Sequence, residues 1–212
     1  MKHIHLATPG SALYNEACIF ANSLYQEKLR TTTNTPSKIM LVATEKRNIV
    51  GCIGLNPSVT SDLFLTDLRY QRFVRQLPRN TIIGEQNIFA VRDYPAGVPL
   101  LIAGIAAYGK VIGVQHIAYA GVNVSCKTVD KLGFTVQTLG NTLHPHCAAA
   151  QKEKYQCWLH DFQPVSCVLS TCNTADIFAQ AIARYGRHTV IDAELQQLIH
   201  TADKQPRTVR YA

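Results

Sequence analysis

The polar segment Glu85-Gln86-Asn87 interrupts a run of apolar residues that favours a β-strand. The run 81–91 is rich in bulky and β-branched residues, which are enriched in strands. Glu85 and Asn87 are two positions apart within it, so a strand places both side chains on one face. A carboxylate in partly apolar surroundings has a raised pKa and can accept a proton near neutral pH. Glu85 is therefore a candidate general base, with Asn87 as an orienting group. The alternative is a salt-bridged glutamate at a strand edge.

The segment after this strand contains groups that can hold an anion. A turn at 93–97 leads into an apolar helix expected over 98–113. Arginine binds two oxygens at once through its planar fork, and the N–H groups at the start of a helix attract anions. The alternatives are a solvated arginine and an ordinary helix start. The candidate cofactor-binding residues are Val91, Arg92, Gly97 and Val98.

Histidine and cysteine side chains raise the question of a metal site. Most of them fall in a polar segment, 141–154, that we expect to be a loop. Their spacing fits no recognised ligand pattern, so we expect no metal. The residues considered are His144, His146, Cys147, Cys157 and His160.

One further cysteine could be a nucleophile. Cys126 begins a short helix expected over 126–132, with Ser125 as its cap. A helix N-terminus can lower the pKa of a thiol, but a nucleophilic cysteine needs a paired histidine, for which His116 is a candidate. Packing in the core is the interpretation that we favour for Cys126.

Hydrophobic spacing predicts the elements that would position these residues. The apolar strands 38–44 and 48–56 form a hairpin, which predicts antiparallel pairing in the first half. Strands that alternate with helices predict parallel pairing in the second half. We therefore predict an α/β fold, with a mixed central sheet flanked by helices. The expected strands are 1–6, 38–44, 48–56, 63–65, 81–91, 115–122, 134–139 and 155–162, and the expected helices are 14–29, 67–77, 98–113, 126–132, 174–185 and 192–202.

Composition narrows the class of protein. The chain has 212 residues, 47% hydrophobic and 17% charged, which suits one sizeable domain and argues against disorder. The net charge of +7 is spread along the chain, without a run of five basic residues. A basic surface can hold nucleic acid, acidic lipid or an acidic small partner. No RNA-binding aromatic motif is present, so we expect no nucleic acid.

Cysteine usage and apolar runs bear on the compartment. The seven cysteines are an odd count, and the N-terminal residues lack the features of a secretory signal. We therefore expect free thiols and a cytoplasmic location. No apolar run is long enough to cross a bilayer, so we expect no membrane association.

The order of elements resembles that of the GNAT acyltransferase superfamily, in which a short helix followed by residues such as Leu132-Gly133-Phe134 is a common ending. More narrowly, the chain resembles the bacterial thermostable hemolysin-like family, which is related to acyl-homoserine-lactone synthases and N-acyl amino acid synthases. The resemblance covers roughly residues 1–185. It is carried by Ile39–Ala43 with Ile49–Leu55, by Leu63-Phe64-Leu65, by Gly84–Ala90, and by Tyr155–Leu169 with its Gln163-Pro164-Val165.

This resemblance implies a function and a site. The central sheet would be splayed between 85–91 and 115–122, where a thioester carrier enters. Tyr119 and Asn123 would then reach the leaving thiolate or the amides of the carrier. The alternative for Tyr119 is an ordinary core residue. The implied reaction is N-acyl transfer to a small amine or amino acid, in signal or specialised metabolism. Acyl-CoA or acyl-phosphopantetheine would be the co-substrate, with no tightly bound cofactor. Residues 1–190 would form the acyltransferase domain and 191–212 a C-terminal helix and tail.

The chain departs from the superfamily at two places. The phosphate-binding loop is replaced by 92–98, which keeps one basic residue and one glycine, and Pro95 and Pro99 remove N–H donors. This departure favours acyl carrier protein as the donor. Leu63-Phe64-Leu65 lacks the glutamate expected after it, and Asp67 comes one position later. Two alternatives stay open: a GNAT-like protein that binds a ligand without catalysis, and a membrane-active, hemolysin-like protein.

Overall fold

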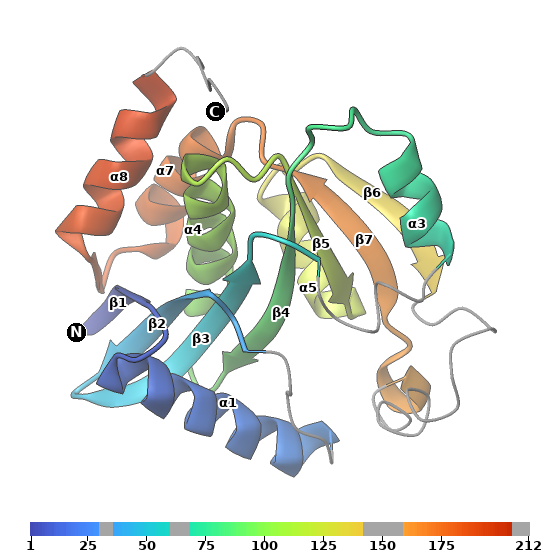
Figure 1. The fold of residues 1–212 in the computed structure, drawn as a ribbon. Coiled ribbons are helices and arrows are strands. Elements are labelled where there is room, and N and C mark those ends of the chain that lie inside the picture. The colour runs from blue at the N-terminus through green and yellow to red at the C-terminus, as the bar shows by residue number, and fades with distance from the viewer. Residues whose placement is uncertain (30–35, 60–67, 142–158, 205–212) are drawn as a thin grey trace.

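A single open sheet organises the chain (Figure 1). The computed structural model describes residues 1–29, 36–59, 68–141 and 159–204. The strands follow the spatial order β6-β7-β5-β4-β3-β2-β1-β8. Parallel and antiparallel neighbours both occur, which confirms the predicted mixed sheet. The strands are β1 Lys2–Ala7, β2 Ile39–Glu45, β3 Asn48–Asn56, β4 Ile83–Val91, β5 His116–Gly121, β6 Val136–Asn141, β7 Val165–Ser170 and β8 Thr189–Ile191.

Helices cover both faces of this sheet (Figure 1). Alternate strand residues pack into separate clusters, because successive side chains point to opposite faces. Met40 and Val42 of β2 pack with α1, whereas Leu41 and Ala43 pack with α4. We call these the α1/α3 face and the α4 face. The helices are α1 Ala12–Leu29, α3 Leu68–Arg75, α4 Gly97–Val111, α5 Asn123–Lys131, α7 Thr174–Tyr185 and α8 Ala193–Lys204.

The largest hydrophobic cluster lies on the α4 face. Helix α4 is apolar on all sides before Lys110 and is mostly buried, because it packs between the sheet and the helices α7 and α8. Leu101 is completely buried there. This confirms that the apolar run after the turn at 93–97 is a buried helix.

Local signals in the first half are confirmed. The N–H of Tyr14 donates to Ser11 Oγ at 3.2 Å, so Ser11 caps α1. Lys46 and Arg47 join β2 and β3 with φ values of 48° and 71°. Positive φ at both central residues is the conformation that closes a two-residue hairpin.

The second half differs from the predicted order. Strand β7 was not predicted, and it lies between β5 and β6, antiparallel to both. Among the described strands, β4 and β5 are therefore the only two strands of this half that pair in parallel with each other. Residues 159–162 are helical, although a strand was predicted over 155–162. The predicted elements 63–65 and 141–154 lie wholly or almost wholly outside the described residues.

The short helix after β5 also begins earlier than predicted. Helix α5 starts at Asn123, and Ser125 does not cap it: its hydroxyl donates to the carbonyl of Val122 at 2.8 Å. Gly133 follows the helix with a φ of 82°, the left-handed conformation that glycine commonly adopts just past a helix C-terminus.

The C-terminal elements pack onto the same core. β8 pairs in parallel with β1, and Ile191, Leu195 and Ile199 belong to the main cluster. The domain boundary at residue 190 remains a prediction, and it falls within β8.

The predicted splay of the sheet is confirmed by the strand register. β4 and β5 pair only through Ile83–His116, Gly84–Ile117 and Glu85–Ala118. Beyond Glu85, β4 continues for six residues to Val91 while still paired with β3. The two central strands therefore part directly after Glu85.

Candidate functional site

Buried polar residues concentrate where β4 and β5 part. Ser37, Asn56, Glu85 and Ser166 are each at most 3% exposed. Glu85 is paired with Asn56 across β3–β4. Ser166 has the same strand parity on β7 as Val168, which packs on the α1/α3 face. Burial of polar groups costs free energy unless they are hydrogen-bonded, so this cluster marks the candidate site.

Glu85 occupies the last paired position before the splay. It is 1% exposed, with Asn56 on one side and Ala118 on the other. Tyr70 of α3 packs in the same cluster as Ala118. Burial raises the pKa of the Tyr70 hydroxyl, and the Glu85 carboxylate raises it further. Glu85 therefore lies under α3, within electrostatic reach of the Tyr70 hydroxyl.

Asn87 stands at a β-bulge on the same face. Gly54 pairs with Ile88 and Leu55 with Gln86, which leaves Asn87 as the extra residue of β4. The hydroxyl of Ser37 donates to Asn87 Oδ1 at 2.7 Å. The structure thus brings Asn87 and Glu85 to one face, as predicted, and Ser37 holds the Asn87 amide in one orientation.

Ser37 is itself held from two sides. The Tyr14 hydroxyl of α1 donates to the carbonyl of Ser37 at 2.6 Å. The next backbone N–H, that of Lys38, donates to Asn56 Oδ1 at 2.7 Å. A chain of hydrogen bonds therefore links α1 to the residues beside Glu85.

Tyr119 lies on the opposite face of the sheet from Glu85. It packs in the α4-face cluster with Cys167 and is 4% exposed. Its hydroxyl has no hydrogen-bond partner among the described residues, and burial raises its pKa. The structure therefore does not bring Tyr119 to Glu85 and Asn87. Asn123 is the first residue of α5, directly after β5 and Val122.

Cys126 does not have the environment of a nucleophile. Burial raises the pKa of its thiol to about 11, although a helix N-terminus can lower the pKa of a thiol. His116 lies at the other end of β5, edge-on to Phe73 at 5.8 Å between ring centroids. The suggested cysteine–histidine pair is therefore absent, and packing explains Cys126.

Alkylation should show that the Cys126 thiol stays protonated near neutral pH. At pH 7.5 we expect Cys126 to react with iodoacetamide at least tenfold more slowly than the exposed Cys172, because only the thiolate reacts. The rate at Cys126 should rise as the pH increases toward about 11, where its thiol titrates. Mass spectrometry of tryptic peptides measures both rates. Equal labelling of the two cysteines at pH 7.5 would contradict this assignment.

The N–H groups at the start of α4 already donate hydrogen bonds to carbonyl groups of the preceding turn. The Gly97 N–H donates to the carbonyl of Tyr94 at 2.9 Å, and the Val98 N–H to that of Pro95 at 3.3 Å. The Tyr94 ring lies against Gly97, where any Cβ atom would overlap it. At the predicted phosphate-binding position, the N–H groups are therefore hydrogen-bonded within their own turn and the Tyr94 ring covers Gly97.

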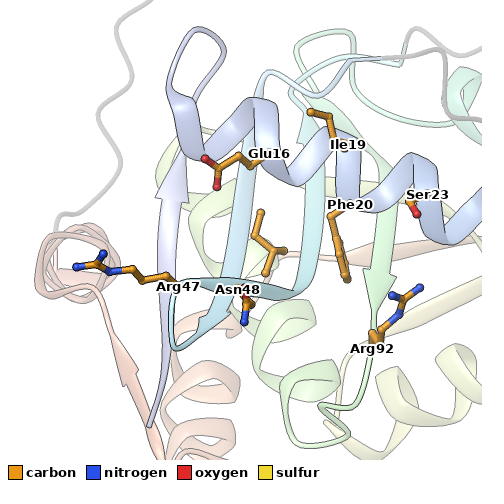
Figure 2. A pocket seen from close by; sticks show the side chains of 8 residues that line it. Glu16, Ile19, Phe20, Ser23, Arg47, Asn48 and Arg92 are labelled. Carbon is orange, nitrogen blue, oxygen red and sulfur yellow. The ribbon is translucent and has the colours of Figure 1, made fainter.

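Arg92 is at the far end of β4 from Glu85. They are seven positions apart, which is roughly 23 Å along a strand. Its side chain pairs with Glu27 of α1, and both groups are about half exposed. Arg92 also borders an open, shallow hollow of about 380 Å³, with Arg47 on another side and Phe20 between them (Figure 2). Val91 and Arg92 are thus at the surface end of the splay.

Three residues beside Glu85 were not predicted from the sequence. Ser37 and Asn56 belong to no recognisable motif, since each depends on contacts between segments far apart in the chain. Tyr70 has a signal that could have been used. It is three positions before Phe73 in a helix with arginines at 69, 72 and 75, and this spacing places Tyr70 and Phe73 on one face of the helix.

A metal centre is not seen in the described part of the chain, where no group of three potential ligands converges. His160 bonds to Asp161 at 2.8 Å. The other four candidates, His144, His146, Cys147 and Cys157, lie outside the described residues. No helix in the ranges described is long and apolar enough to span a membrane.

The eight-stranded mixed sheet, parted between β4 and β5 and flanked by helices, is the fold of GNAT-like acyltransferases. The solved structures that share it include three that are compared below. The acyl-homoserine lactone synthase BjaI, with SAM and isopentyl-CoA, superposes with a TM-score of 0.56, 17% identity and coverage of 96% of this chain and 98% of its own.

The other two likenesses are similar in extent. For the AHL synthase LasI the TM-score is 0.57 at 11% identity, covering 81% of this chain and 90% of that one. For FeeM, an N-acyl amino acid synthase from uncultured soil microbes, it is 0.53 at 13% identity, covering 81% and 96%. No family model and no curated protein matches the sequence. The fold is thereby established, and membership of the hemolysin-like family remains a prediction.

Proposed function

We propose that this protein is an N-acyltransferase that moves an acyl group from a carrier thioester to a small amine or amino acid. One observation carries the proposal: a buried glutamate, Glu85, stands at the point where the two central strands part. A carrier can enter the sheet there, and the glutamate meets it at the inner end.

The residues have defined roles in this reaction. Glu85 accepts a proton from the ammonium group of the acceptor. The free amine then attacks the thioester carbonyl and its nitrogen gives up a second proton as the C–S bond breaks. The carrier sulfur takes up that proton and leaves as a thiol. Asn87, fixed by Ser37, orients the substrate beside the carboxylate. Burial of the site excludes water, which would otherwise hydrolyse the thioester.

The donor that we favour is acyl carrier protein. The N–H groups of Gly97 and Val98 are satisfied within their turn, so they are poorly placed to hold the pyrophosphate of CoA. The net charge of +7 also suits an acidic protein partner. Because BjaI was solved with isopentyl-CoA and FeeM is an N-acyl amino acid synthase, both donor types and amino-acid acceptors belong in the test.

The test is direct. The purified protein is incubated with acyl carrier protein or CoA thioesters of several chain lengths and with a panel of amines and amino acids. Mass spectrometry should find an N-acylated product that depends on the protein, more from carrier-protein thioesters than from CoA thioesters. A full panel without product would overturn the proposal.

The closed start of α4 favours one alternative, a GNAT-like protein that binds a ligand without catalysis. In that case, acyl thioesters or carrier protein raise the melting temperature, yet no acyl transfer follows.

A further inference from the structure

Beyond the splay, β4 is paired with β3 on one side only. The peptide groups that point to its other side have no strand partner there among the described residues. The N–H of Arg92 donates to the carbonyl of Val50 at 2.9 Å, which fixes the phase of the β3–β4 ladder. In an antiparallel pair, alternate residues bond to the partner strand. Phe89 is opposite Ile53 in the non-bonded phase, so its N–H and C=O point away from β3. They face the side from which β5 has parted.

A single side chain from α1, that of Tyr25, forms hydrogen bonds with both of these groups. The Tyr25 hydroxyl accepts from the Phe89 N–H at 2.8 Å and donates to the Phe89 carbonyl at 3.0 Å. The hydroxyl thereby makes the two hydrogen bonds that a peptide group on a neighbouring strand would make. Burial raises the pKa of this hydroxyl, so it stays protonated and able to donate at neutral pH.

We infer that the Tyr25 hydroxyl occupies the position that an amide of the donor's arm takes on binding. An extended, amide-bearing thioester arm would then displace the Tyr25 hydroxyl from Phe89. This inference rests on the proposed function. An exposed strand edge pairs with an extended chain of alternating C=O and N–H groups. The phosphopantetheine arm of a carrier has amides of this kind, and Val91 presents its peptide groups in the same direction two residues further on.

The geometry gives Tyr25 two effects of opposite sign. Without ligand, its hydroxyl satisfies two backbone groups of Phe89 and stabilises the strand edge. With ligand, the same hydroxyl competes with the arm for these groups. Loss of the hydroxyl should therefore weaken the free protein and strengthen binding of the arm.

Tyr25→Phe tests this with pantetheine as the probe. We expect a lower melting temperature without ligand, and a Kd for pantetheine about tenfold lower than in the wild type, measured by calorimetry. Tyr185→Phe is the matched control, because Tyr185 ends α7 on the α4 face, and its Kd should equal that of the wild type. An unchanged or higher Kd in Tyr25→Phe, or no binding at all, overturns the inference.

A second measurement serves if Tyr25→Phe does not fold. With 3-fluorotyrosine at position 25 of the full chain, saturating pantetheine should move the ¹⁹F signal toward that of a solvent-exposed tyrosine, and an unmoved signal overturns the inference. Acyl transfer is measured separately. Product formation with an unchanged Kd in Tyr25→Phe would sink the role of Tyr25 and leave the proposed function standing. Tighter binding without product would do the reverse.

Discussion

Glu85→Gln should lower kcat/KM for acyl transfer by about 10²–10⁴-fold, the usual contribution of a general base. Glutamine has nearly the same shape, so it can keep the packing of the buried position between Asn56 and Ala118. It cannot accept the proton of the amine. Release of the carrier thiol, followed with a chromogenic disulfide, measures the rate, and circular dichroism checks the fold.

The control for Glu85→Gln removes a carboxylate elsewhere. Glu16→Gln lies on the outer side of α1 beside the open hollow, and it should leave the rate within about twofold of the wild type. Glu85→Asp should retain more activity than Glu85→Gln, because it keeps a base at a displaced position. Activity of Glu85→Gln within threefold of the wild type would refute the assignment of the base.

Gly54→Ala should destabilise the protein by about 3 kcal/mol, from overpacking and loss of a buried hydrogen bond. A Cβ atom at position 54 would overlap Ser37 Oγ and lie 2.8 Å from Ser37 Cβ. Ser37 is fully buried and held by Tyr14, so it cannot move aside cheaply. The urea midpoint measures the loss, and acyl transfer by the folded fraction should also fall because Asn87 loses its partner.

Two further variants separate this clash from a general effect of alanine in β3. Gly51→Ala adds a Cβ at 3.2 Å from a Leu101 methyl group and 3.3 Å from a Val91 methyl group, which small side-chain shifts can relieve. It should cost about 1 kcal/mol or less. Ser37→Gly in the Gly54→Ala background removes the clashing atoms and should restore part of the stability. Equal midpoints for Gly54→Ala and Gly51→Ala would show that the contact with Ser37 is not limiting.

The bulge offers a physical account of the splay. Glu85 is the last residue of β4 paired with β5, and the bulge at Asn87 follows two residues later. A bulge bends its strand and increases the local twist, which turns the rest of β4 away from β5. Tyr25 then satisfies the exposed edge at Phe89. The same local irregularity thus opens the sheet and positions the candidate base at the opening.

Much of the fold could be predicted from local patterns. The helix α4 is a long apolar run after a turn, the β2–β3 hairpin has a polar two-residue loop, and Gly133 ends α5. These features depend on neighbours within a few residues, so propensity and periodicity reveal them. The strand that holds Glu85 and Asn87 belongs to the same group, and so does their shared face.

Other features depended on pairing between distant segments. β7 lies between β5 and β6, although β6 precedes it by more than twenty residues. Such an insertion cannot be read from the order of elements. It also explains why the predicted parallel pairing stops at β5.

In the candidate site, too, some features follow from local sequence patterns and others depend on pairing between distant segments. Residue types and strand alternation were sufficient to select Glu85, yet they could not show that Tyr119 faces the other side, because that depends on the register between β4 and β5. Tyr25 and Phe89 are 64 residues apart in sequence. Periodicity reports the environment of a residue along its own element, whereas the partner across a sheet is set by long-range register and packing, which only the folded chain determines.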